Sequence, residues 1–152
     1  MNPTITVADV RAALATIRQL MDANRDRLIE LDNDLGDGDL GLTMTKGFAA
    51  AEAEAAASEE TEPGRLLMKT GMRMAREAPS TLGTLLATGL MRGGKALDSQ
   101  AGAATEQMAA FLQAFVAGIR ERGKTARGNK TIVDSLGPAA GELQSPFLRT
   151  DD

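Results

Sequence analysis

Apolar residues recur along this chain at steps of three, four or seven positions, and this spacing restricts its fold more than any other feature. The first series includes Val10, Leu14, Ile17 and Leu31. Residues at these intervals share one face of a helix. A half-buried strand would instead alternate apolar and polar residues, and no segment does so convincingly over the length of a strand. The pattern therefore predicts an all-α protein.

The caps and breakers between the apolar runs divide the chain into about six helices. Thr6 and Asp9 form a capping box before the first helix, and a polar linker at 58–64 follows the second. The expected helices cover 7–31, about 43 to 57, 65–77, Thr81 to Gly93-Gly94 or soon after, a stretch capped by Thr105, and Thr131 to about Leu143. We expect one domain over 1–143 and a polar tail over 144–152.

The composition excludes several classes of function. The chain has 152 residues, which suits one domain, and it contains neither histidine nor cysteine. Zinc sites with imidazole or thiolate ligands, disulfides and cysteine nucleophiles are therefore ruled out. A net charge of −4 gives no footprint for nucleic acid. No apolar run approaches the roughly 20 residues of a membrane span, and the N-terminus lacks signal-peptide features. We expect a cytoplasmic protein without nucleic-acid or membrane partners.

An aspartate-rich loop follows the first predicted helix. Residues 32–39 hold four aspartates and two glycines, and Gly41 comes just after them. Carboxylates this close repel one another, whereas a hard divalent cation such as Mg²⁺ binds such oxygen ligands. Asp37 and Asp39 can converge if the loop bends at its glycines, and Asp32 can add a carboxylate from the helix end. The loop is thus a candidate magnesium site.

Two other interpretations of this loop compete with a magnesium site. Asp and Gly are common turn residues, so a plain polar turn between helices is one alternative. A calcium-binding EF-hand is the other, and its spacing fails. A loop that starts at Asp32 places Asp37 where glycine is needed, and one that starts at Asp37 places Phe48 where glutamate is needed.

Three segments resemble, in order, the nucleotide-binding (L) subunit or domain of dihydroxyacetone kinases. The metal loop of that family resembles 31–41, its helix start beside the nucleotide phosphates resembles 79–84, and its Arg-Gly-Lys and Gly-Asp-Lys-Thr elements resemble 122–124 and 128–134. The resemblance implies that Asp32, Asp37 and Asp39 bind Mg²⁺, as two ions, with Asp34 outside the ligand set. It also implies nucleotide contacts from Leu40, Gly41, Leu42, Thr43, Ser80, Thr81, Gly123 and Ile132.

The resemblance further implies an antiparallel helical bundle or barrel with ADP or ATP at one end. The partner subunit of that family holds a small ketose covalently on a histidine, so a chain without histidine fits the nucleotide subunit. The phosphoryl donor is ATP in some systems, and in others a phosphotransferase-system protein rephosphorylates bound ADP. A homodimer is a further possible assembly.

The chain departs from the family pattern at several places. Leu40 stands where the family usually has histidine, and Asn129 stands for an aspartate. Relatives continue for about two more helices, so we expect a C-terminally shortened member that lacks them. A non-catalytic regulatory or scaffolding protein is therefore the alternative function. For Ser80 and Thr81, simple N-capping of a helix is the alternative to phosphate binding. For the basic residues Lys124, Arg127 and Lys130, the alternative is that they are ordinary solvated surface charges.

Overall fold

The computed structural model describes residues 4–99 and 102–143, and these residues form helices and connecting turns without strands. The helices are α1 (Val7–Ala23), α2 (Arg25–Asn33), α3 (Leu40–Ala57), α4 (Pro63–Glu77), α5 (Thr81–Ser99), α6 (Ala104–Gly123) and α7 (Ile132–Glu142). The predicted all-α class is confirmed. The predicted polar tail at 144–152 lies outside the described residues.

The predicted count of six helices is wrong, because the described residues form seven. The expected first helix breaks at Asn24, whose backbone leaves helical geometry (φ −105°, ψ 7°). The Asn24 side-chain Nδ2 donates to the Leu20 carbonyl at 2.8 Å, and its backbone N–H donates to the same oxygen at 3.1 Å. Asparagine readily competes with a helix through such local bonds. Because the apolar spacing continues across the break, the sequence pattern did not reveal the break.

Several predicted helix ends also differ. α5 continues past Gly93 and Gly94 to Ser99, because these glycines let neighbouring helices pack closely. A Cβ on Gly93 would collide with the Phe111 ring, and one on Gly94 would lie 3.0 Å from Leu67 Cβ. α6 begins at Ala104, where Glu106 accepts a hydrogen bond from Ala103 N–H at 3.1 Å, so Thr105 is not its cap. α3 and α4 begin a few residues earlier than expected.

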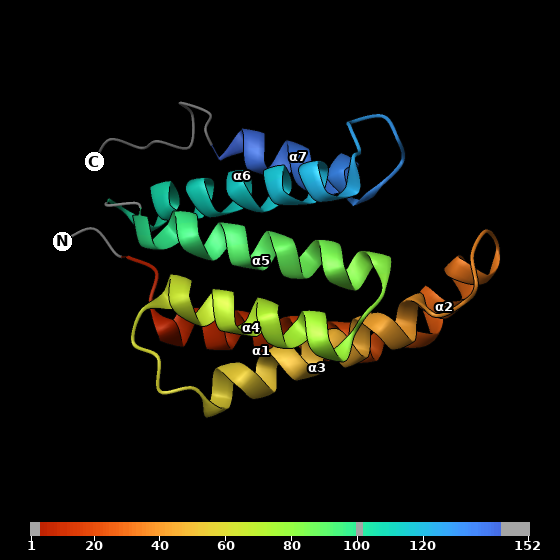
Figure 1. The fold of residues 1–152 in the computed structure, drawn as a ribbon, viewed down its shortest axis with the longest axis horizontal. Helices are drawn as coiled ribbons and strands as arrows, with labels where there is room; N and C mark the ends of the chain where they lie inside the picture. Colours follow the sequence, from red (N-terminus) through yellow and green to blue (C-terminus); the bar gives the residue numbers. More distant parts are fainter. Residues whose placement is uncertain (1–3, 100–101, 144–152) are drawn as a thin grey trace.

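Helices that follow one another from α3 to α7 pack side by side in alternating directions, and α1 covers α3 and part of α4 (Figure 1). The core is mainly aliphatic. Its least exposed large side chains are Leu66, Met74, Leu97, Ile119 and Val133. No helix in the described ranges is long and apolar enough to cross a membrane.

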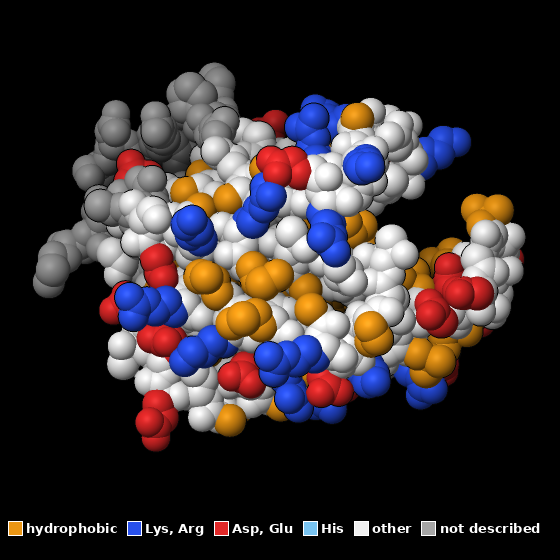
Figure 2. All heavy atoms as spheres, viewed as in Figure 1, with side chains coloured by type: hydrophobic (Ala, Val, Ile, Leu, Met, Phe, Trp, Pro, Cys, Tyr) orange, Lys and Arg blue, Asp and Glu red, His pale blue; other side chains and the backbone are white. Residues whose placement is uncertain are grey.

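Three connections lie at one end of the molecule: the α2–α3 turn, the α4–α5 turn and the α6–α7 loop, which comprises residues 124–131 (Figure 1). We use the term arm for α2, the turn 34–39 and the first turn of α3. The arm projects beyond the other helices, and α2 has no buried residue. Figure 2 shows a hollow between the arm, which carries acidic side chains, and the α6–α7 end, which carries basic ones.

Candidate functional site

The three aspartates predicted to bind metal lie together on the arm. One carboxylate oxygen from each of Asp32, Asp37 and Asp39 lies within 4.8 Å of the others. We call these residues the acidic cluster. Asp32 belongs to the last turn of α2 and is half-buried, whereas Asp37 and Asp39 are exposed in the turn. The cluster thus combines one carboxylate on a helix with two on a loop, and its three converging carboxylates could hold a divalent cation.

Two glycines allow the turn to fold back on the end of α2. The N–H groups of Leu35 and Gly36 both donate to the Asp32 carbonyl, at 3.2 and 2.6 Å. A Cβ on Gly36 would collide with the Asp32 carboxylate. Gly38 has a positive φ of 75°, and a Cβ there would collide with the side-chain amide of Asn33. Both positions therefore need glycine, the first because of contact and the second because of contact and backbone conformation.

The crowding of negative charge appears in the pKa of Asp39. Desolvation raises the pKa of this carboxyl above its ordinary value, and the negative charges of Asp37 and Asp32 raise it further, followed by a hydrogen bond with Asp37. Each of these effects opposes the charged form. A bound cation would favour the charged form instead.

The start of α3 completes the arm. Asp39 occupies the N-cap position but makes no side-chain capping bond, and Leu40 N–H donates to Asp32 Oδ2 at 3.2 Å. Thr43 N–H donates to the Asp39 carbonyl at 2.9 Å. The first N–H groups of a helix have no acceptor within the helix. The N–H groups of Gly41 and Leu42 can therefore donate to an acceptor outside it. The first turn of α3 is therefore suited to bind an anion beside the cluster.

Gly41 also has a packing role. A Cβ at this position would collide with the Arg25 carbonyl and lie 2.8 Å from Ile29 Cγ1, so Gly41 lets α2 and α3 pack closely. Leu42 is 48% exposed. It borders an open cleft of about 520 Å³ whose other lining residues are Asp22, Arg25, Thr45, Lys46 and Ala49.

Ser80 is the N-cap of α5. Its Oγ accepts from Gly83 N–H at 3.0 Å, and its carbonyl accepts from Thr84 N–H at 2.9 Å. The capping interpretation of Ser80 is therefore confirmed. The hydroxyl hydrogen is still free to donate, because a serine hydroxyl both donates and accepts. Thr81, exposed in the first helical turn, contributes another N–H group without an intrahelical acceptor.

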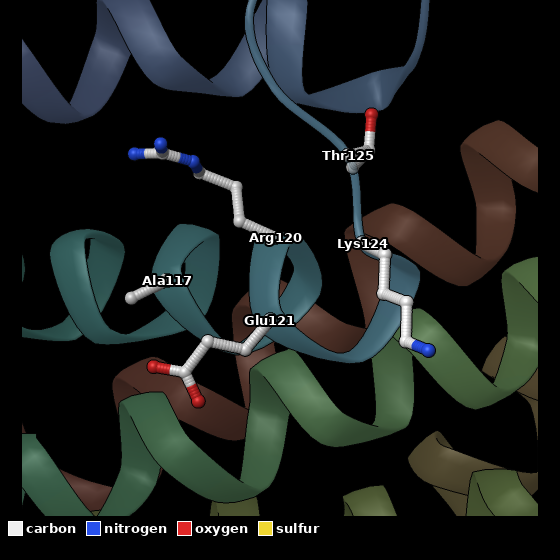
Figure 3. Close-up of a pocket in the computed structure, with 5 residues that line it drawn as sticks. All are labelled: Ala117, Arg120, Glu121, Lys124 and Thr125. Atoms are coloured by element: carbon white, nitrogen blue, oxygen red, sulfur yellow. The ribbon is translucent and has the colours of Figure 1, made fainter.

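The α6–α7 loop joins the bundle through Gly123, where a Cβ would lie 3.2 Å from Leu85 of α5. Ile132, at the start of α7, packs against the core. An open cleft of about 450 Å³ beside Lys124 is lined by Ala117, Arg120, Glu121 and Thr125 as well. Arg120 and Lys124 point in different directions (Figure 3). The two cations therefore do not converge on one ligand within this cleft.

The structure brings the acidic cluster together, while the other predicted residues lie on three separate connections at the same end of the molecule (Figure 1). The need for glycine at position 83 was not predicted from the sequence. A Cβ on Gly83 would collide with the Ala78 carbonyl. The hydrogen bond from Gly128 N–H to the Asp134 carboxylate, at 2.6 Å, was not predicted either. The position of Gly83 in the first turn of a helix was the sequence signal that could have indicated its close contact with Ala78.

The DAK2 domain matches residues 34–150 of the chain. This range includes every predicted site residue except Asp32, which lies two residues before it.

Three relatives illustrate the similarity. The PEP-dependent dihydroxyacetone kinase 1, ADP-binding subunit DhaL, of Listeria innocua is 31% identical over 129 residues, which are 85% of this chain and 64% of the relative. The corresponding DhaL subunit of Escherichia coli is 28% identical over 117 residues, 77% of this chain and 56% of the relative. L-erythrulose kinase of Pectobacterium atrosepticum is 30% identical over 131 residues, 85% of this chain and 22% of the relative.

The chain thus spans less than two thirds of the length of these curated relatives. The match to the DAK2 domain nevertheless covers most of the chain, the all-α fold agrees with the expectation, and the motifs that carried the resemblance fall almost entirely within the matched residues. The chain therefore belongs to the DAK2 domain family.

Proposed function

We propose that this chain is the Mg²⁺-nucleotide subunit of a dihydroxyacetone-type kinase and takes part in phosphoryl transfer to a small ketose held by a partner subunit. The observation that carries the proposal is the convergence of Asp32, Asp37 and Asp39 within 4.8 Å. The similarity to subunits named as ADP-binding supports the nucleotide assignment.

The donor set fits the proposed metal. Mg²⁺ prefers oxygen ligands and commonly combines a few carboxylates with phosphate oxygens and water. Asp32, Asp37 and Asp39 offer three carboxylates of which two are exposed, so a nucleotide could complete the coordination from the solvent side. We propose that these residues hold one or two ions. When bound, Mg²⁺ would neutralise charge on the phosphate oxygens.

The other parts of the site would bind and orient the nucleotide. The N–H groups of Gly41 and Leu42 on α3, and the start of α5 at Ser80 and Thr81, would donate to phosphate oxygens. Leu40 and Thr43 would complete the contacts from the arm, and Gly123 and Ile132 those from the α6–α7 end. Phosphoryl transfer depends mainly on positioning and charge stabilisation, so this half of the reaction does not require the histidine that the chain lacks.

We also propose the assembly in which this subunit works. A separate ketose-binding subunit would supply the acceptor, and either ATP or a phosphotransferase-system protein would supply the phosphoryl group in the cytoplasm. Residues 1–143 would form the nucleotide-binding domain, and a homodimer is a possible arrangement. Addition of a ketose-binding subunit of the family should reconstitute ketose phosphorylation.

Isothermal titration calorimetry tests the metal assignment. Wild-type protein should bind ADP in the presence of Mg²⁺, and Asp37→Ala and Asp39→Ala should weaken this binding strongly. Asp34→Ala is the matched control, because Asp34 lies in the same turn but outside the acidic cluster. Equal binding by all four proteins would refute the assignment. Magnesium-independent association with a partner, without nucleotide binding, would favour a regulatory or scaffolding role instead.

A further inference from the structure

The Asp134 carboxylate joins two separate parts of the backbone. Its Oδ2 accepts from Thr131 N–H at 3.0 Å, and the Thr131 hydroxyl oxygen accepts from Val133 N–H at 3.3 Å, so these residues cap α7. Its Oδ1 accepts from Gly128 N–H at 2.6 Å. This second bond reaches six residues back along the chain, into the middle of the α6–α7 loop, and is not needed to cap the helix.

The cap at the start of α1 shows what capping alone requires. Asp9 occupies the equivalent third helical position, and its Oδ2 accepts from Thr6 N–H at 2.8 Å and from the Thr6 hydroxyl at 2.6 Å. Among the residues that the structure describes, the Asp9 side chain forms its hydrogen bonds with Thr6, within its own capping box. Asp134 therefore has a capping role like that of Asp9 and an additional bond to a distant loop residue.

The α6–α7 loop has a backbone that needs such support. Lys124 and Lys130 have positive φ values of 49° and 55°, and Gly128 has a φ of 90°. Non-glycine residues in this region are strained and persist only where their surroundings hold them. The other side-chain bonds across the loop are long, since Thr125 Oγ lies 3.4 Å from both Thr131 Oγ and Asn129 Nδ2. The bond from Gly128 to Asp134 is the shortest of the bonds that hold the loop, and it acts together with those from Thr131 N–H to Asp134 at 3.0 Å and from Asn129 N–H to the Ala126 carbonyl at 3.3 Å.

The loop stands where a ligand bound to the arm would meet the bundle. It lies at the end that holds the acidic cluster and the start of α5 (Figure 1), and it faces the arm across the hollow in Figure 2. The contact between Gly123 and Leu85 places Lys124 next to α5, and the Lys124 side chain extends on that side (Figure 3). A change in loop conformation would move this lysine and the N–H groups beside it.

We propose that Asp134 is a positioning residue that holds the α6–α7 loop in the conformation that receives the nucleotide. This inference rests on the proposed function. Asp134 acts through Gly128 and Thr131 and does not itself touch the nucleotide. Because the acidic cluster is on a different connection, the loop conformation should affect nucleotide affinity and leave Mg²⁺ binding in the absence of nucleotide unchanged.

Asp134→Asn tests the proposal against the matched control Asp9→Asn. An asparagine side chain has one oxygen, so it can accept from only one side and turns an NH₂ group toward the other N–H. We expect Asp134→Asn to weaken the affinity for ADP in the presence of Mg²⁺ about tenfold, the scale of one charge-assisted bond. Amide hydrogen exchange at Gly128 should also become faster. Asp9→Asn weakens the same kind of helix cap, so it should lower the thermal stability but keep the wild-type affinity for ADP.

Gly128→Ala provides a second variant. A Cβ at Gly128 meets nothing within 4 Å, so the substitution disturbs only the positive φ and leaves the Asp134 carboxylate intact. It should weaken ADP binding too, and it tests the proposal if Asp134→Asn does not fold. Wild-type affinity in both folded variants, or an equal loss in Asp9→Asn, would overturn the inference. Failure of the wild-type protein to bind ADP would instead overturn the proposed function.

Discussion

Replacement of Gly36 by alanine should disable the acidic cluster without unfolding the protein. The new Cβ would lie 3.0 Å from Asp32 Cγ and 3.1 Å from the Asp32 carbonyl oxygen, and it would collide with Oδ1. Carbon atoms in ordinary contact are about 3.5–4.0 Å apart, so the carboxyl carbon has to retreat by roughly 0.5–1 Å. Metal sites tolerate ligand displacements of only about 0.2 Å.

The stability of the fold should change little, because the two main effects of Gly36→Ala oppose each other. Alanine reduces the entropy of the unfolded chain, which is worth about 0.4–1 kcal/mol where the backbone accepts it, and Gly36 does not have a positive φ. Movement of Asp32 breaks its bond from Leu40 N–H, at a cost of about 1 kcal/mol. The net change in the free energy of unfolding should therefore lie within about 1 kcal/mol.

Urea denaturation and calorimetry together measure both quantities for Gly36→Ala. We expect a near wild-type free energy of unfolding and an affinity for Mg²⁺ with ADP that is lower by about tenfold or more. Gly141→Ala is the control, since a Cβ there meets nothing within 4 Å on the exposed side of α7, and it should bind normally. Unchanged affinity in Gly36→Ala would show that the Asp32 carboxylate does not hold the metal.

Three further outcomes concern the fold and its caps. Leu66→Ala should lower the free energy of unfolding by about 2–5 kcal/mol in urea denaturation, because Leu66 is fully buried, and a loss below 1 kcal/mol would contradict the core assignment. Ser80→Ala should lower it by about 1 kcal/mol in the same assay, through the lost cap of α5. Hydrogen bonds from the Thr6 side chain and backbone lower the pKa of Asp9 below 3.8. The stability from this ionised carboxylate is present above pH 3.8 and lost as the pH falls through the lowered pKa. The melting temperature of Asp9→Asn should therefore depend less on pH in this acidic range than that of the wild type.

Local chemistry explains which parts of the fold could be predicted from the sequence. The capping box at Thr6 and the cap at Ser80 depend on residues within three positions, so the sequence contains the whole interaction. The convergence of Asp37 and Asp39 also depends on a short turn with glycine. These features were predicted from residue types and spacing alone, and the structure has them.

The features that were missed depend on residues distant in sequence or on competition between similar energies. Gly93 and Gly94 read as a helix end, but contacts with Phe111 and Leu67 make them packing positions inside α5. The break at Asn24 leaves the apolar spacing intact, so periodicity could not locate it. The bond from Gly128 to Asp134 depends on the path of the α6–α7 loop, which the residue types do not specify.

Thermal unfolding of the wild-type protein with and without Mg²⁺ and ADP tests the central claim most directly. A ligand that binds only the folded state stabilises it by about 2.7 kcal/mol when present at about 100 times its dissociation constant. Mg²⁺ and ADP together should therefore raise the melting temperature by several degrees, and ADP with a chelator should raise it less. An identical melting temperature in all of these conditions would contradict the claim that the aspartates on the arm bind a nucleotide through a divalent cation.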